Sequence, residues 1–205
     1  AALAHLAEAA VPEGINTLIL NGPSQPLTEA ARYRLDQFLL GGGALLVFLD
    51  SHIQEIPPQQ ALAQGARPTW RSNETGLVEQ LTNYGVTVTD RLVLDQESFV
   101  ATQGGRRQQI YQAPLLQGDA LNRDHVITSQ LEDIILFNTA ELLSATVDEE
   151  QEVTVLLQSS PEAWTLGDPE QIGPWIQGPP DSAQTGRKNL GLLLEGSFES
   201  YFDPP

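Results

Sequence analysis

The 205-residue sequence contains no cysteine and no methionine, and it has only ten lysine and arginine residues against 27 aspartate and glutamate residues. Without thiols the chain forms no disulfide, binds neither a cysteine-ligated zinc ion nor an iron–sulfur cluster, and has no cysteine nucleophile. The formal charge of −17 would repel a phosphate backbone. The composition therefore excludes nucleic acid as a partner.

Long hydrophobic runs are also absent. The longest, such as residues 44–49 (ALLVFL), have the length of a strand, whereas a membrane-spanning helix needs about 20 apolar residues. The chain is nevertheless long enough to bury a core without disulfides or metals, and the missing methionine favours a fragment of a longer polypeptide. We expect a single α/β domain over residues 1–205, part of a membrane-anchored protein whose anchors lie outside it. A subdivision would fall near residues 98–121.

A strand–helix–strand pattern occupies residues 15–49 and indicates the fold class. Residues 15–20 and 44–49 are apolar strands, and the helix between them begins after Thr28 and ends near Leu40. Uninterrupted apolar strands are typical of a parallel sheet covered on both faces. We therefore expect an α/β fold, a mainly parallel sheet flanked by helices, with additional antiparallel strands in the C-terminal half. Those strands are predicted at 134–137, 141–147, 152–157 and 189–194.

Two further segments are predicted from local composition. Residues 51–71, rich in Pro, Gln and Ala, predict a long mobile loop. Residues 104–107 (GGRR) predict a hairpin turn or a mobile loop. A second helix is expected to begin at Ser72 or Asn73 and to end at Tyr84.

The sequence predicts no cofactor and no metal. The glycines at 41–43 follow a helix and precede a strand, the reverse of a phosphate-binding loop, so they are interpreted as a helix C-cap. The histidines are far apart, without a pair at metal-binding spacing. The acidic runs at 95–97 and 148–152 do not match a calcium-binding loop and are interpreted as solvated turns.

The triplet Asp50-Ser51-His52 is the strongest candidate for a reactive site in this sequence. It follows a predicted parallel strand, at the sheet edge where open α/β sheets bind ligands, and the residue ending the other strand is expected beside it. Side chains of consecutive residues diverge from an extended chain, so no internal Ser–His–acid relay is expected. We favour a ligand- or partner-binding crevice and keep a carbohydrate or ester hydrolase using Asp50 or His52 as the alternative. The crevice residues are Asn21, Gly22, Asp50, Ser51 and His52.

Several segments together resemble the auxiliary (GldG-like) component of gliding-motility-type ABC transport systems. They run in order along nearly the whole chain, which makes the resemblance specific although each segment alone is weak. The segments are 21–28 (NGPSQPLT), 35–39 (LDQFL), 42–43, 45–50 (LLVFLD), 84–86 with Asp95, 121–125 (LNRDH), 154–164 (TVLLQSSPEAW) and 190–202.

The resemblance implies a soluble domain on the extracytoplasmic, periplasmic side of the inner membrane, flanked by transmembrane helices and working beside an ATPase and a permease. It implies a fold similar to the glutamine-amidotransferase-like α/β class, whose enzymes use a cysteine that this chain lacks. The family brings no catalytic residues, so none is carried over. We expect a non-enzymatic accessory domain that docks onto ABC permease and ATPase subunits or onto a companion auxiliary protein.

Overall fold

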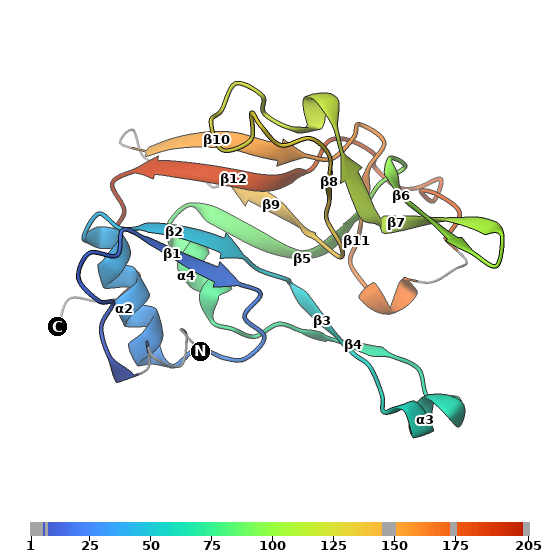
Figure 1. Ribbon diagram of the computed structural model, residues 1–205, viewed down its shortest axis with the longest axis horizontal. Helices are drawn as coiled ribbons and strands as arrows, with labels where there is room; N and C mark the ends of the chain where they lie inside the picture. Colours follow the sequence, from blue (N-terminus) through green and yellow to red (C-terminus); the bar gives the residue numbers. More distant parts are fainter. Residues whose placement is uncertain (1–5, 7, 145–150, 173–175, 203–205) are drawn as a thin grey trace.

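The computed structural model describes residues 6, 8–144, 151–172 and 176–202. Helix α2 and a small parallel sheet lie at one end of the longest axis, and a larger antiparallel sheet lies beside them (Figure 1). Two hairpins project at the opposite end.

The N-terminal strand–helix–strand unit forms as the sequence predicts. Strand β1 (Thr17–Asn21) pairs in parallel with β2 (Ala44–Phe48), and helix α2 (Glu29–Leu40) connects them. Thr28 caps the helix, because its Oγ1 accepts a hydrogen bond of 3.2 Å from the backbone N–H of Ala31. The predicted βαβ unit is therefore confirmed.

The three glycines end helix α2, as predicted. The Gly41 N–H donates to the carbonyl of Gln37 at 3.0 Å. Gly42 has a φ of +88°, which side-chain-bearing residues rarely adopt. A Cβ atom at Gly43 would lie 2.4 Å from the ring of Phe38. Gly42 and Gly43 are thus the glycines that the turn from the helix into β2 requires.

Among the described residues, only one face of the β1–β2 pair is covered. On the other face Ile19, Leu46 and Phe48 are 61%, 45% and 53% exposed. The covered face packs against α2 and against helix α4 (Leu77–Asn83). Its buried cluster consists of Leu6, Leu20, Ala31, Leu35 and Leu77.

Beyond this unit the sheets are antiparallel, so the prediction of a mainly parallel, glutamine-amidotransferase-like sheet is wrong. After β2 the described chain continues into an antiparallel hairpin instead of a second crossover helix. The pair β1–β2 therefore gains no further parallel neighbour among the described strands. The main sheet has the strand order β10-β12-β9-β5-β11, and every neighbouring pair in it is antiparallel. Its strands are β5 (Val86–Leu94), β9 (Ala140–Ser144), β10 (Gln151–Gln158), β11 (Trp164–Leu166) and β12 (Asn189–Gly196).

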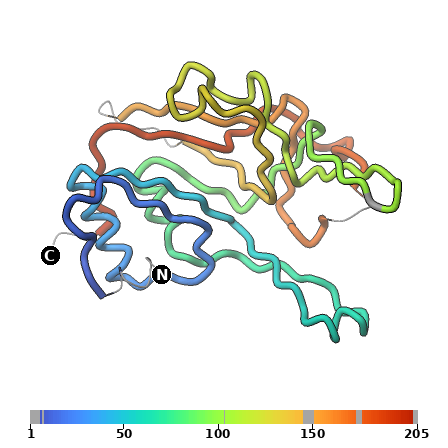
Figure 2. Tube along the Cα trace, viewed as in Figure 1, coloured from blue at the N-terminus to red at the C-terminus, as the bar shows by residue number. Residues whose placement is uncertain are grey.

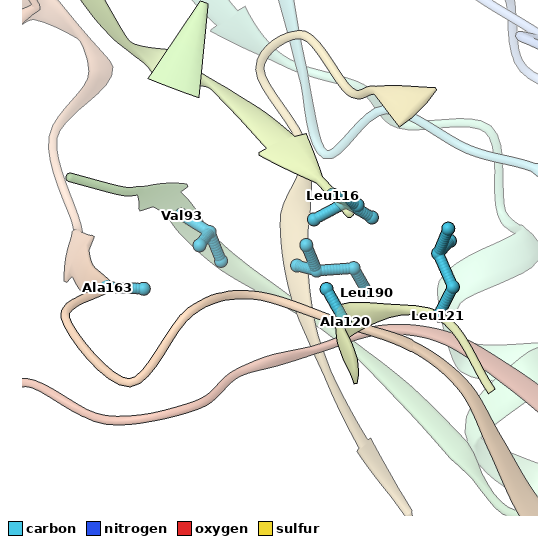
Figure 3. Packing of buried hydrophobic residues seen from close by; sticks show 6 residues of the cluster. All are labelled: Val93, Leu116, Ala120, Leu121, Ala163 and Leu190. Carbon is cyan, nitrogen blue, oxygen red and sulfur yellow. The ribbon is translucent and has the colours of Figure 1, made fainter. Parts of the chain in front are cut away.

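Strand β5 runs through the centre of the core. Its residues Leu92, Val93 and Leu94 have no exposed surface. Leu92 and Leu94 pack with Trp164, whereas Val93 belongs to a different cluster (Figure 3). The other members of that cluster are Leu116, Ala120, Leu121, Ala163 and Leu190. Burial in two clusters explains the continuous apolar run at the end of this antiparallel strand.

The two projecting hairpins account for the segments predicted as loops (Figures 1 and 2). The first, here called the arm, replaces the loop predicted over 51–71. It consists of β3 (His52–Glu55), α3 (Gln59–Ala63) and β4 (Thr69–Ser72). The second, the β6–β7 hairpin, confirms the hairpin turn predicted over 104–107. Its strands are β6 (Ser98–Gln103) and β7 (Arg106–Leu116), and β8 (Ile134–Ile135) pairs with β7.

Two short 3₁₀ helices complete the described secondary structure, η1 (Gly118–Ala120) and η2 (Pro169–Gln171). The C-terminal strand predictions correspond to β8, β9, β10 and β12, except that residues 145–150 lie outside the described residues.

A buried carboxylate joins helix α2 to the C-terminal part of the chain. Asp36 has no exposed surface. It accepts hydrogen bonds from the hydroxyls of Tyr84 and Ser200, both at 2.7 Å, and from the Tyr201 N–H at 2.9 Å. Burial alone would raise the pKa of this carboxyl, but the hydrogen bonds outweigh burial and hold the pKa of Asp36 below its usual value. Burial and the carboxylate raise the pKa of Tyr84, so its hydroxyl stays protonated and donates.

The C-terminal segment, residues 198–202, lies against α2 through aromatic contacts as well. The rings of Tyr33 and Phe202 pack edge to face with centroids 5.4 Å apart. The guanidinium of Arg32 lies 5.6 Å from the ring centroid of Tyr201, a cation–π contact. The segment is therefore held by charge, hydrogen bonds and ring packing together.

We expect Asp36→Asn to lower the free energy of unfolding by about 2–3 kcal/mol at pH 7, because buried donors lose an ionised acceptor. A carboxyl whose pKa is lowered in the folded state adds stability above its unfolded pKa and loses it as the pH falls through the folded value. The difference in the free energy of unfolding between wild type and Asp36→Asn should thus shrink below about pH 4. Urea unfolding at several pH values measures it.

The matched control for this experiment is Asp90→Asn, an exposed aspartate whose side chain forms no hydrogen bond with a described residue. Its unfolding free energy should stay within about 0.5 kcal/mol of wild type. Equal stability of Asp36→Asn and Asp90→Asn at pH 7 would contradict the structural role of Asp36.

Candidate functional site

The structure brings the strand-end residues of the predicted site to one edge of the β1–β2 pair. Because the strands run parallel with Asn21 opposite Phe48, Asn21 and Asp50 lie at the same edge. The Gly22 N–H donates to the carbonyl of Phe48 at 2.9 Å. A Cβ atom at Gly22 would lie 4.0 Å from Oδ2 of Asp50. The βαβ geometry therefore brings the ends of both strands to one edge, as predicted, and places Gly22 beside the carboxylate.

Asn73 connects the backbone segments of this edge, a role that sequence reasoning missed. It is 6% exposed, and its Nδ2 donates to the carbonyls of Pro23 at 2.9 Å and Asp50 at 2.8 Å. Its N–H donates to the carbonyl of Ser51 at 2.9 Å. The prediction that a helix begins at Ser72 or Asn73 is wrong: α4 begins only after Gly76, whose φ is +77°.

The Asp50 carboxylate itself has no hydrogen-bond donor among the described residues. The residue is exposed as a whole, while partial burial of the carboxyl raises the pKa of Asp50. A carboxyl with a raised pKa holds its proton more readily, which suits a proton donor. That role also requires a second group that contacts the substrate, and none adjoins the carboxylate in the described part of the chain.

Ser51 and His52 contact each other, so the expectation that their side chains diverge is wrong. Ser51 Oγ lies 3.0 Å from Nδ1 of His52. The chain bends at Ser51 and extends only from His52 onward, so the two residues do not alternate as in a straight strand. A serine nucleophile needs a base that is itself oriented by a third group. No carboxylate of the described segments accepts a hydrogen bond from this histidine.

A second buried carboxylate was misassigned from the sequence. Asp95, predicted in a solvated turn, has no exposed surface. It accepts from the N–H and the hydroxyl of Ser160 at 2.7 and 2.5 Å, and from the Glu97 N–H at 3.0 Å. These bonds hold the segment between β10 and β11 against the end of β5. One sequence signal could have revealed that Asp95 is buried: it directly follows the apolar run LVL at 92–94.

The described residues offer no metal centre: no three His, Asp or Glu side chains lie together where they could hold an ion. Two surface hollows lie away from the predicted crevice. One, of about 380 Å³, is lined by β7 and by Ile172, Ile176 and Gln177. The other, of about 490 Å³, lies between Val11 and helix α2. None of the described helices has the length and apolar character needed to cross a membrane.

The described residues define a mixed α/β domain, mostly antiparallel, whose two fully buried carboxylates hold chain segments together. The chain belongs to the family described as "ABC-type uncharacterized transport system", whose sequence model matches residues 2–205. It is accordingly an auxiliary component of an ABC-type transport system, and the family implies association with other transporter components. Searches of curated proteins and of solved structures returned no match.

We expect Asn73→Ala to lower the free energy of unfolding by about 1–3 kcal/mol. The reason is that the backbone carbonyls of Pro23 and Asp50 lose the hydrogen-bond donor that the buried Asn73 side chain supplies. Thermal and urea unfolding of the purified domain measure the loss. The neighbouring exposed residue provides the control, and Glu74→Ala should leave the midpoint unchanged. If both variants unfold at the wild-type midpoint, Asn73 does not hold this edge together.

Proposed function

We propose that this domain is a non-catalytic docking module of a gliding-motility-like (GldG-like) auxiliary protein. In this proposal it lies on the extracytoplasmic side of the inner membrane, held there by anchors outside this chain. It associates with the assembly of permease and ATPase subunits, or with a companion auxiliary protein of that assembly. The family membership supports a place in an ABC transport system, and the resemblance of the segments from 21–28 to 190–202 supports the gliding-motility-like assignment.

The observation that carries the docking role is the arm. Helix α3 at its tip has no buried residue, and the preceding Ile56 is 67% exposed. Leu62 on α3 is also exposed, at 38%. A five-residue helix is too short to be stable alone in water, and here it projects from the body of the molecule (Figure 1). Apolar side chains on a projecting element are typical of an interaction site.

The non-catalytic part of the proposal is supported by the chemistry at the sheet edge. The Asp50 carboxylate lacks a partner among the described residues, and the Ser51–His52 pair lacks an orienting acid there. The hydrolase alternative is favoured by one observation, the 3.0 Å contact between Ser51 and His52. It is therefore retained as the second candidate, with carbohydrate or ester substrates.

The docking test uses the full-length protein co-expressed with its permease and ATPase. We expect wild type to co-purify with them in mild detergent, and Ile56→Ser with Leu62→Ser to reduce recovery at least tenfold, because an interface loses its apolar anchors. Val126→Ser is the matched control, since this residue is 82% exposed outside the arm. Unchanged recovery of the arm variant, with the control also unchanged, would count against docking through the arm.

The same protein is then assayed against a panel of ester and glycoside substrates. We expect no turnover above that of Ser51→Ala and Asp50→Asn, since the described site lacks an orienting acid. Turnover by wild type that both substitutions abolish, together with no partner recovery, would replace docking by the hydrolase alternative.

A further inference from the structure

The charges of this chain are divided between the body and the two hairpins. Residues 52–72 and 98–116 together contain one acidic residue, Glu55, and four arginines. The rest of the chain holds 26 acidic and six basic residues, a formal charge of −20. Both hairpins project at the same end of the longest axis, opposite helix α2 (Figure 1). The two hairpins therefore carry a net positive charge on an otherwise acidic molecule.

The arginines at this end differ from the basic residues elsewhere in what they contact. The side chains of Arg67, Arg106 and Arg107 are exposed and form no hydrogen bond or ion pair with any described residue. Arg71 pairs with Glu55 at 2.8 Å within the arm.

The basic side chains of the body are each bound within the chain. Arg187 bonds to Asp119 at 2.6 Å, and Lys188 lies 3.6 Å from Glu141. The remaining ones donate to backbone carbonyls or to a hydroxyl. Within the described chain, free guanidinium groups therefore occur only on the two projecting hairpins.

We propose that the arm and the β6–β7 hairpin form a docking end for an acidic protein surface, with Arg67, Arg106 and Arg107 as its charged contacts. This inference rests on the proposed docking function and names the chemistry of the partner. Arginine binds carboxylates through two parallel hydrogen bonds, which gives a directed contact. The neighbouring apolar tip residue Ile56 supplies the uncharged part of the interface.

A protein surface fits this end better than an anionic membrane does. A membrane is an extended plane of negative charge that also faces the body, whose charge of −20 it would repel. An acidic patch of limited size can contact the free arginines of the hairpins without covering the rest of the body. The four-residue strands of the arm extend about 13 Å, beyond the screening length of about 8 Å at physiological ionic strength. At the tips the repulsion from the body is therefore largely screened.

The first experiment titrates the isotope-labelled domain with poly-L-glutamate at 150 mM salt and follows backbone amide NMR signals. We expect shifts confined to residues 52–72 and 98–116. Arg67→Glu and Arg106→Glu should each weaken binding at least fivefold, whereas Arg91→Glu, with the same change of charge on the body, should not. Shifts spread over the body, or an equal loss in all three variants, would overturn the proposal. So would shifts produced by phosphatidylglycerol vesicles and not by poly-L-glutamate.

The second experiment separates this inference from the proposed function. Full-length Arg67→Glu/Arg106→Glu/Arg107→Glu is co-expressed with the permease and ATPase, beside wild type and Arg91→Glu. Loss of recovery in the triple variant alone supports the proposal. Wild-type recovery of the triple variant overturns the acidic docking end while the proposed function stands. If wild type recovers no subunit, the proposed function fails, and the poly-L-glutamate result alone decides whether the end binds carboxylates.

Discussion

The arrangement of the two halves of this domain depends on one buried carboxylate. An ionised carboxyl is stable inside a protein only when donors replace its water, and Asp36 obtains them from its own helix, from Tyr84 at the end of α4, and from the C-terminal segment. That segment follows directly from β12 of the main sheet, so its docking on α2 links that sheet to the βαβ unit. The buried clusters of the main sheet and of the βαβ unit are thereby held in one arrangement.

The features that were predictable from the sequence are those determined by residues close together in the chain. The Thr28 cap, the glycine C-cap and the parallel β1–β2 pair each depend on fewer than about 40 consecutive residues, a span that turn and capping rules cover. The position of Asn21 and Asp50 at one sheet edge follows from the same helical crossover between β1 and β2. Local rules were therefore enough to locate the edge, though not to assign it a chemistry.

The features that were missed depend on contacts between distant segments. An apolar run is ambiguous, because LVL at 92–94 is buried in two clusters within an antiparallel strand, whereas ALLVF at 44–48 leaves one face exposed. Composition also cannot distinguish a loop from a hairpin whose strands pair with each other, as in the arm. Asp36, Asp95 and Asn73 look like surface residues in the sequence. Their donors and acceptors lie up to 165 residues away.

The distance along the chain between Asp36 and Ser200 also orders the folding of the protein in time. A ribosome releases the chain from its N-terminus at about 5–20 residues per second, so α2 emerges many seconds before its C-terminal partners. During that interval the donors from Ser200 and Tyr201 are missing, and water takes their place at the carboxylate. Contacts of such long sequence separation form late and slowly. A nascent chain stopped before residue 198 would therefore leave helix α2 without the partners of Asp36 and Tyr33 in the C-terminal segment.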